Sequence, residues 1–236
     1  MKEILIKDII RECNASLIIG DENLKIENFS KDTREINEND CYIGIKGETF
    51  DGNLFYEEAF KKGASACILE KESVKDIDFR NYNNKTIIIV DNSIKFLQEL
   101  AAYKRSLYDI PVIAVTGSVG KTSTKEIISS VLSTKYNVLK TEGNYNNHIG
   151  LPLTILKLKE HNAMVLEMGM NHLNEINLLS KIAKPTIAVI TNIGTAHIGN
   201  LGSRENILKA KLEIIDGLKE NGTLIINNDN DMLHNN

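Results

Sequence analysis

Short apolar runs alternate with helical patterns through the second half of the chain, from Pro111 onward. The apolar runs predict strands over residues 111–117, 137–141, 162–169, 185–194 and 222–229. The segments between them predict helices over residues 121–135, 171–183 and 203–218. Strands that are apolar on both faces and are separated by helices are typical of a mostly parallel sheet covered on both sides.

The first half of the chain has a mixed pattern. It predicts strands over residues 40–47, 65–70 and 85–91, and helices over residues 53–64 and 93–108. In the second helix Ile94, Leu97, Leu100 and Ala101 share one face. We therefore expect an α/β protein in which a small α/β N-terminal domain, residues 1–109, precedes a central parallel-sheet domain, residues 110–236. The sequence shows no flexible linker at that boundary.

The composition of the chain excludes several classes of protein function. The chain has 236 residues, is 42% hydrophobic and 25% charged, and carries a formal net charge of -4. It therefore lacks the basic footprint of a nucleic-acid binder, and no apolar run is long enough to cross a bilayer. Its three cysteines, Cys13, Cys41 and Cys67, are far apart, which favours reduced thiols. The N-terminus does not read as a signal peptide, so we expect a cytoplasmic protein.

The segment TGSVGKTS, residues 116–123, follows a strand and opens a helix. The backbone N–H groups of such a glycine-rich loop and of the helix start form a cradle for phosphate. Lys121 would reach the outer phosphates, and the hydroxyl of Thr122 would bind Mg²⁺. The usual phosphate loop has a glycine where this chain has Val115, so its first glycine is Gly117. The alternative is a glycine turn with a solvated lysine.

Three further polar residues draw attention at or near the ends of the predicted elements. Glu167 ends an apolar run, and His197 lies in a glycine-punctuated loop after another. Lys211 neighbours a predicted apolar stripe of Leu208, Leu212 and Ile215 on a helix. Taken one at a time, such residues are more often an ordinary loop acid, a surface histidine and a solvated lysine.

Taken together, the motifs closely resemble those of the Mur ligases. They are TGSVGKTSTK, EGNYNNHIGLPLT, LEMGMNH and TNIGTAHIGNLGSRENILKAKLEI, in that order, and residues 29–69 resemble the uridine-nucleotide domain of the family. Within the family, YNNHIGLPLT and EMGMN look most like the ligase that adds D-alanyl-D-alanine to UDP-N-acetylmuramoyl-tripeptide. In that reaction ATP phosphorylates the peptide carboxylate, and an incoming amine displaces the phosphate to form an amide.

The resemblance implies roles for particular residues. The ATP-binding residues are Gly117, Ser118, Val119, Gly120, Lys121, Thr122 and Ser123. The metal-binding residues are Thr122, Glu167, His197 and Lys211, of which Lys211 matches a family lysine that is often carbamylated. The catalytic residues are Lys121, His197 and Lys211. The substrate-binding residues are Thr33, Arg34, Lys46 and Gly47 in the first domain and Asn144 and Asn147 in the second. The implied cofactors are ATP and Mg²⁺.

The family pattern also includes a third, C-terminal domain that completes the ATP site. This sequence stops part-way through the expected central domain, and a chain without that closing domain should turn over poorly. We expect a monomer whose partners are the two small-molecule substrates, with no nucleic acid and no membrane insertion. Two alternatives remain. One is a sibling amide ligase, such as another Mur ligase, a folylpolyglutamate synthase or a cyanophycin synthetase, and the other is a non-catalytic nucleotide-binding module.

Overall fold

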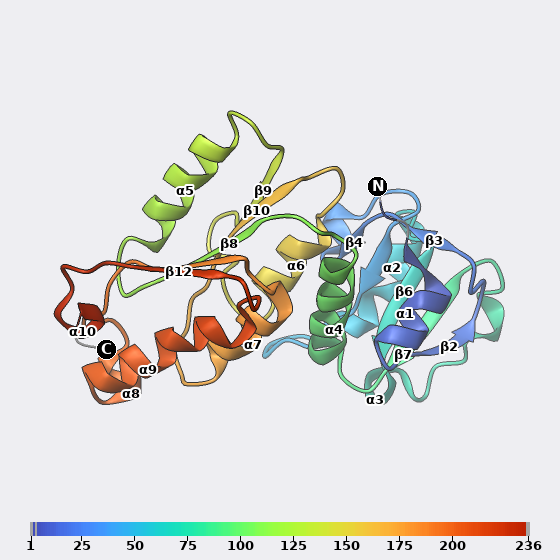
Figure 1. The fold of residues 1–236 in the computed structure, drawn as a ribbon. Helices are drawn as coiled ribbons and strands as arrows, with labels where there is room; N and C mark the ends of the chain where they lie inside the picture. The colour runs from blue at the N-terminus through green and yellow to red at the C-terminus, as the bar shows by residue number, and fades with distance from the viewer. Residues whose placement is uncertain (1, 3, 235–236) are drawn as a thin grey trace. The chain divides into compact units, whose positions relative to one another are not determined.

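The computed structural model describes residue 2 and residues 4–234. The chain forms two compact units, Met1–Lys104 and Arg105–Asn236, each of mixed α/β structure (Figure 1). The sequence places the boundary at residues 109/110, whereas the structure divides the chain near the end of helix α4 (Ser93–Ser106). Each unit contains a five-stranded sheet that is mostly or wholly parallel, so the predicted fold class is confirmed.

The sheet of the first unit has the strand order β2-β7-β6-β5-β4. Its strands are β2 (Ser16–Ile19), β4 (Phe29–Ser30), β5 (Cys41–Ile43), β6 (Ala66–Glu70) and β7 (Thr86–Val90). All neighbours pair in parallel except β2 and β7, which are antiparallel. A separate antiparallel pair joins β1 (Ile4–Leu5) to β3 (Lys25–Ile26). The sequence predicted β5, β6 and β7 but missed β1 to β4, which have two to four residues each.

The helices of the first unit are mostly short. They are α1 (Ile6–Glu12), η1 (Thr33–Glu35), η2 (Gly52–Phe55), α2 (Tyr56–Lys61), α3 (Lys71–Val74), η3 (Phe79–Asn81) and α4. The helix predicted over residues 53–64 begins as the 3₁₀ turn η2 and becomes α-helical only at Tyr56. In α4 the predicted face is buried at Leu97, Leu100 and Ala101.

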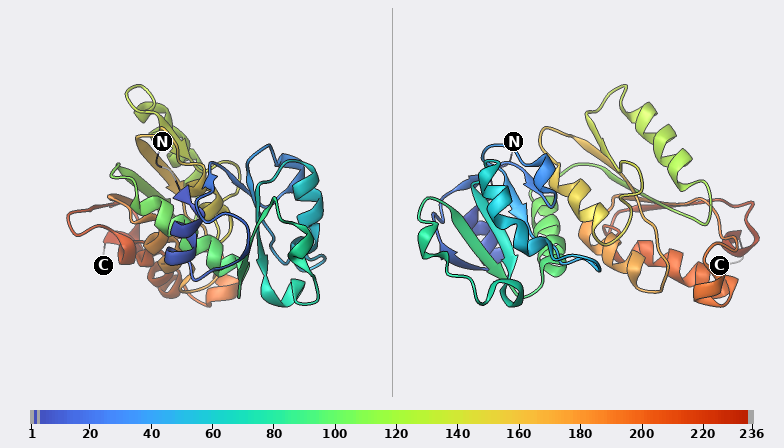
Figure 2. Two further views of the ribbon diagram at one scale, coloured as in Figure 1. Left: turned by 90° about the vertical axis from the view of Figure 1, so that its right-hand side faces the viewer. Right: turned by 180° about the vertical axis from the view of Figure 1, so that it is seen from behind.

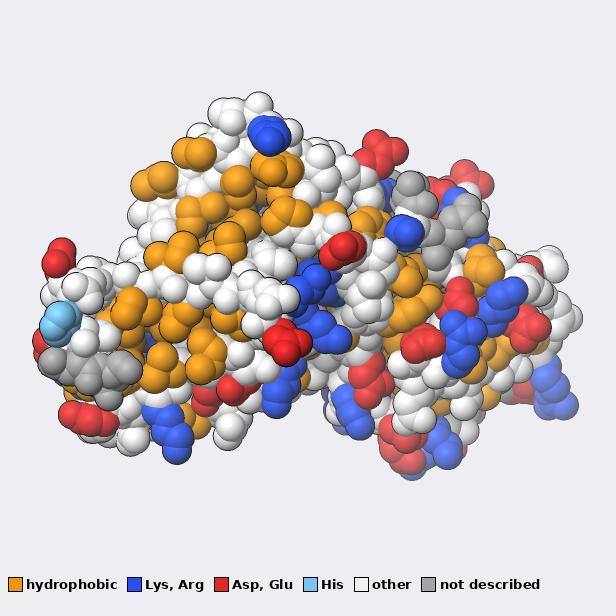
Figure 3. All heavy atoms as spheres, viewed as in Figure 1, with side chains coloured by type: hydrophobic (Ala, Val, Ile, Leu, Met, Phe, Trp, Pro, Cys, Tyr) orange, Lys and Arg blue, Asp and Glu red, His pale blue; other side chains and the backbone are white. Residues whose placement is uncertain are grey.

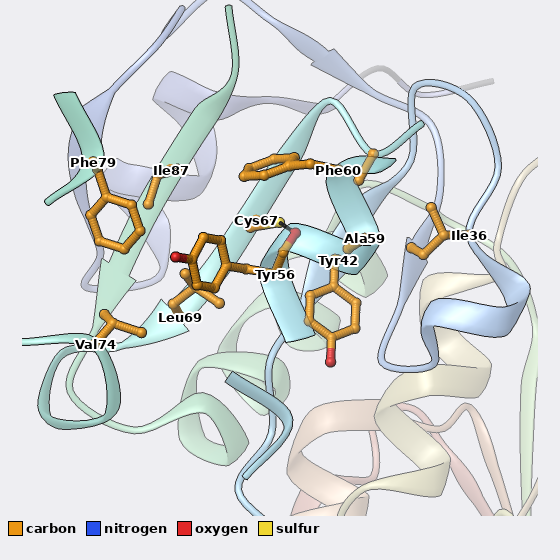
Figure 4. Close-up of a cluster of buried hydrophobic side chains, with 11 residues drawn as sticks. Ile36, Tyr42, Tyr56, Ala59, Phe60, Cys67, Leu69, Val74, Phe79 and Ile87 are labelled. Carbon is orange, nitrogen blue, oxygen red and sulfur yellow. Dashed lines mark hydrogen bonds between the residues drawn. The ribbon is translucent and has the colours of Figure 1, made fainter. Parts of the chain in front are cut away.

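Aromatic and aliphatic side chains fill the core between α2 and the first sheet (Figure 4). Tyr56 is central to it, since its ring meets the rings of Phe60 and Phe79 edge-on at centroid distances of 6.3 and 5.6 Å. Ile87 of β7 and Leu69 of β6 are fully buried beneath these rings. The packing of these side chains holds α2 against β6 and β7.

The sheet of the second unit has the strand order β12-β11-β8-β10-β9, and every neighbouring pair is parallel. Its strands are β8 (Val112–Thr116), β9 (Val138–Lys140), β10 (Ala163–Glu167), β11 (Ile187–Ile190) and β12 (Thr223–Ile226). Each lies within one of the five predicted runs. β8 and β10 are buried along their whole length because they have neighbours on both sides and helices over their faces.

Helix α5 (Lys121–Leu132) lies on one face of this sheet, and α6 (Gly150–Leu156) and α7 (Glu175–Ala183) lie on the other (Figures 1 and 2). The remaining helices are α8 (Ile198–Leu201), α9 (Arg204–Leu212), η4 (Glu213–Gly217) and α10 (Asp231–His234). The helix predicted over residues 203–218 is therefore broken into α9 and η4. The fully buried helix α6 was not predicted.

Apolar side chains remain exposed on the face that carries α5 (Figure 3). They are Ile127 and Val131 on α5 and Ile225 on β12. Leu224 and Ile226 of β12 are also exposed, but they point to the opposite face because side chains alternate along a strand. β12 pairs only with β11 and forms the edge of the sheet, so its apolar run is not covered on both sides as the sequence predicted. Within residue 2 and residues 4–234, no helix has the length and apolar character needed to span a membrane.

The core in Figure 4 predicts the effect of truncating Ile87. Ile87→Ala should lower the free energy of unfolding of the first unit by about 2–5 kcal/mol, because it removes buried methyl groups and leaves a cavity. Urea unfolding followed by circular dichroism measures this loss. Ile18→Ala is the control, since Ile18 lies in the neighbouring strand but is 54% exposed, and its effect should stay within about 0.5 kcal/mol. Equal losses in the two variants would contradict this assignment of the core.

Candidate nucleotide and metal site

The carboxyl ends of three parallel strands bring the candidate residues of the second unit together. In the sheet register Glu167, the last residue of β10, lies opposite Val115 of β8, and Thr116 of β8 lies opposite Ile190 of β11. β8 is the first strand of this sheet in the chain, with β10 on one side and β11 on the other. In parallel α/β sheets this arrangement creates a crevice at the carboxyl ends of the strands, where ligands bind.

The loop between β8 and α5 needs glycine at two positions. Gly120 has φ +80° and precedes the first residue of α5, a backbone conformation that costs other residues energy. Gly117 has φ +153°, and a Cβ atom there would lie 1.8 Å from the Oγ1 of Thr191. Val115, where the usual phosphate loop has its first glycine, is a fully buried residue of β8. The loop is therefore shorter than the usual one and begins at Gly117.

The N-terminus of α5 opens from this loop. The first N–H groups of an α-helix have no partner within the helix, and the helix dipole makes this end attractive to anions. Lys121, the first residue of α5, donates from its Nζ to the carbonyl oxygen of Gly117 at 2.9 Å. Its ammonium group is thus held across the loop mouth, where it would meet a bound phosphate.

Thr122 and Glu167 are in direct contact. The Oγ1 of Thr122 donates to the Oε2 of Glu167 at 2.8 Å, and the Nδ2 of Asn146 donates to the Oε1 of Glu167 at 2.9 Å. The backbone N–H of Glu167 in turn donates to the Oγ1 of Thr141 at 3.0 Å. Glu167 is only 3% exposed, so this carboxylate has exchanged water for protein donors. The sequence missed Asn146, although it lies in the same asparagine-rich segment as the two asparagines that were proposed.

Lys211 is buried on α9, with 2% of its surface exposed. Loss of water and the positive charge of Lys121 lower the pKa of its ammonium to about 7. The predicted stripe was wrong in part, since Ile215 is 44% exposed and Leu212 is half-buried. The structure buries Ile207, Leu208, Ala210 and Lys211 instead, because the helix ends at Leu212 and η4 turns the chain.

His197 is exposed and has a left-handed backbone conformation, with φ +65°. Partial desolvation and the positive charges of Lys211 and Lys121 lower the pKa of its imidazole. The histidine and the two lysines therefore sense one another's charge. The neutral imidazole, which is the form that binds metals, is favoured there.

The two asparagines proposed as substrate ligands have other contacts. The Oδ1 of Asn147 accepts hydrogen bonds from the backbone N–H groups of Ile149 and Gly150, which cap the start of α6. Asn144 is exposed, and its carbonyl oxygen accepts from the backbone of Asn146. The two capping hydrogen bonds give Asn147 a structural role at the start of α6 that requires no ligand. Its role and that of Asn144 in substrate binding stay predictions.

The four residues proposed in the first unit lie near its surface. Arg34 forms a two-pronged ion pair with Asp32, which lowers the pKa of that carboxyl to about 2, and Thr33 donates to Glu58 at 2.9 Å. Lys46 and Gly47 open an exposed turn in which the N–H of Gly47 donates to the carbonyl of Phe50 at 2.9 Å. A bound diphosphate would have to compete with Asp32 for the guanidinium of Arg34.

The contact between Thr122 and Glu167 fits a small hard cation. It offers a hydroxyl and a carboxylate oxygen side by side, which are ligands that Mg²⁺ accepts. Among the described residues, no group of three or more His, Cys, Asp or Glu side chains converges on one point. Mg²⁺ commonly binds through one or two carboxylates together with phosphate oxygens and water. A cation here would accordingly be held jointly by the protein and by a bound phosphate.

Comparison with known proteins agrees with this geometry. Residues 115–236 match the model of the Mur ligase middle domain, and residues 25–105 match that of the Mur ligase family, catalytic domain. The chain belongs to the Mur ligase family. The middle-domain match begins at the end of β8 and includes the whole of the site described above.

Individual Mur ligases are similar over nearly all of this chain. The UDP-N-acetylmuramoyl-tripeptide--D-alanyl-D-alanine ligases of Bacillus subtilis and Synechocystis are 48% and 41% identical over 91% and 97% of the chain. Crystal structure I of MurF from Acinetobacter baumannii superposes with a TM-score of 0.87 at 33% identity over 98% of the chain. MurF from Thermotoga maritima, solved in complex with ADP, gives 0.77 at 38% identity over 89%.

The chain spans about half the length of these Mur ligases. It covers 46% and 49% of the two curated relatives and 50% and 47% of the two solved chains.

Burial of Lys211 predicts a pH dependence of stability. The pKa of this group is lowered in the folded state, so between about pH 7 and its ordinary value near 10.5 the unfolded chain binds the extra proton. The contribution of Lys211 to the free energy of unfolding therefore rises with pH across that window, by at most about 1.4 kcal/mol per pH unit. Urea unfolding of the wild type and of Lys211→Met at pH 7.5 and 9.5, in buffer free of carbon dioxide, measures the effect.

The control for this prediction is Lys209→Met, which removes an exposed lysine two residues earlier on α9. It should keep the rise seen in the wild type, whereas Lys211→Met should lose it. If all three proteins respond equally to pH, Lys211 is not held in a depressed state by its surroundings.

Proposed function

We propose that this chain carries the ATP-binding and UDP-substrate-binding parts of an ATP-dependent ligase. The reaction joins D-alanyl-D-alanine to UDP-N-acetylmuramoyl-tripeptide through an acyl phosphate. The observation that carries the proposal is the contact between Thr122 and Glu167 at the start of α5, beside a glycine loop closed by Lys121. The names of the relatives supply the substrates.

In this proposal the second unit holds the polyphosphate of ATP. The backbone N–H groups at the start of α5 bind phosphate oxygens, and Lys121 neutralises charge on the phosphoryl group that is transferred. Thr122 and Glu167 hold Mg²⁺, which offsets the negative charge of the phosphates when it is bound. Phosphoryl transfer to a carboxylate depends mainly on such positioning and charge stabilisation, and no protein nucleophile is required.

Lys211 has a distinct role in this proposal. A lysine whose pKa lies near 7 is substantially a neutral amine at physiological pH. A neutral amine adds carbon dioxide and releases one proton, which gives a carbamate. The carbamate would place a negative charge where the positive charge of Lys121 acts on Lys211, and its oxygen atoms would be available as metal ligands.

The first unit binds the UDP-linked peptide in this proposal. The planar guanidinium of Arg34 suits a diphosphate, since it donates two hydrogen bonds at once. Thr33, Lys46 and Gly47 supply further donors near the surface of the same unit. Asp32 holds the Arg34 fork in place until an anion replaces it.

A thermal-shift titration with Mg-ATP tests the nucleotide site. A ligand that binds only the folded state at a hundredfold excess over its Kd stabilises that state by about 2.7 kcal/mol. The wild type should be stabilised in this way, and Lys121→Ala should lose most of the effect. Lys181→Ala, which removes an exposed lysine of α7, should respond like the wild type. A Mg-ATP response that survives in Lys121→Ala would show that the glycine loop does not bind phosphate.

A second titration with UDP-N-acetylmuramoyl-tripeptide tests the site of the first unit. Arg34→Ala should weaken the response by about tenfold or more in Kd, because a charge-assisted pair of hydrogen bonds is lost. Arg80→Ala is a closely matched control. Arg80 of η3 pairs with Asp78, the residue before that turn, just as Arg34 of η1 pairs with Asp32, the residue before its turn. Equal affinity of the two variants would count against the assigned diphosphate contact. A wild type that responds to Mg-ATP but not to the UDP-peptide would favour a sibling ligase.

A further inference from the structure

The loop after β8 is fastened to the segment after β11 through several hydrogen bonds. The Oδ1 of Asn192 accepts from the backbone N–H groups of Ser118 and Val119, both at 3.0 Å. The Oγ1 of Thr191 donates to the carbonyl of Val119 at 2.6 Å, and the N–H of Gly194 donates to the Oγ of Ser118 at 2.9 Å. The two segments therefore interlock through side chains and backbone of both.

The interlock is also sterically tight. Gly117 passes so close to Thr191 that any larger residue at 117 would collide with its hydroxyl. The N–H of Ser118 additionally points at the backbone carbonyl of Asn192, at 3.1 Å. Such close fit on several sides leaves the loop little freedom to adopt another shape.

The position of Asn192 gives its side chain a particular importance. Two consecutive loop N–H groups converge on its one amide oxygen, a geometry that backbone N–H groups also adopt around anions. The N–H groups at the start of α5 and the ammonium of Lys121 belong to the same loop and are left to face a ligand. The loop conformation that presents them is thus fixed from outside the loop, by Asn192.

We infer that Asn192 is a positioning residue for polyphosphate binding. Its amide oxygen holds the Ser118 and Val119 N–H groups so that the loop stays shaped for phosphate before the nucleotide arrives. The inference rests on the proposed nucleotide-binding function of the loop. It also ties that loop to the segment carrying His197, which lies five residues after Asn192 in the same connection.

The test combines amide hydrogen exchange with titrations on this chain. Exchange at Ser118 and Val119 is measured without ligand, and affinity is measured by calorimetry for Mg-ADP and for Mg-tripolyphosphate, which probes the phosphate cradle without a base. Asn192→Ala should lose protection chiefly at Val119, because the Ser118 N–H keeps the backbone carbonyl of residue 192 as a second acceptor. It should bind each probe about tenfold more weakly, since two hydrogen bonds that order the loop are gone. Asn192→Asp keeps an acceptor oxygen and should keep the protection.

Asn162→Ala is the matched control. The Oδ1 of Asn162 also accepts a hydrogen bond from a backbone N–H group, that of Asn137 at 2.7 Å. Asn162 lies just before the amino end of β10, whereas the loop lies at the carboxyl ends of the strands. This variant should bind both probes like the wild type, so a drop seen only in Asn192→Ala separates positioning from a general loss of stability. Lys121→Ala should lose affinity while the two amides stay protected.

The outcomes separate the inference from the function on which it rests. If the wild type binds both probes and Asn192→Ala binds them equally well, the positioning role is refuted and the proposed function stands. If the wild type binds neither probe although its Ser118 and Val119 amides are protected, the proposed function fails and the positioning role falls with it. Unprotected amides in the wild type, or lost protection in Asn192→Asp, would refute the role assigned to the amide oxygen.

Discussion

The hydrogen bond between Thr122 and Glu167 joins the two elements on which the site depends. Thr122 lies in the first turn of α5, and Glu167 is the last residue of β10, the strand beside β8. The bond therefore fixes the start of the helix over the carboxyl ends of the strands. Because Glu167 also accepts from Asn146, its carboxylate cannot rotate away without leaving a buried acceptor unpaired.

Charge at this edge of the sheet is only partly balanced within the chain. Lys211 is buried near Lys121 without a carboxylate partner among the described residues. This burial and the nearby positive charge lower the pKa of its ammonium group. Burying an unpaired cation destabilises a fold, so a protein normally neutralises the group or supplies an anion. A polyphosphate, or a carbamate on Lys211 itself, has the charge that this region lacks. In the proposed function, the energetic cost of burying Lys211 and the affinity for an anion would therefore have the same origin.

Much of the fold could be predicted because its strongest signals are local. The strands of the second sheet are apolar runs bounded by polar or glycine residues, and all five were found. The elements that were missed are the short strands β1 to β4, the short helices α1, α3, α8 and α10, the turns η1 and η3, and α6. Helix α6 is buried all round and so shows no helical periodicity. The surroundings of Lys211 were predicted incorrectly in part, because no local pattern marks where α9 gives way to η4.

The contacts of the site were harder to predict than its residue types. The glycine loop, Glu167, His197 and Lys211 could be proposed because they follow strands or match a family motif. Asn146 bonds a residue that lies 21 positions away in the sequence, and Asn192 bonds residues more than 70 positions away. Sequence spacing gives no indication of such pairs. Sequence therefore located the groups proposed to face a ligand, while the contacts that hold those groups emerge only from the packing of one loop on another. In parallel sheets the strand order brings loops that are distant in the sequence together at the carboxyl ends of the strands, so one loop can hold another in place there.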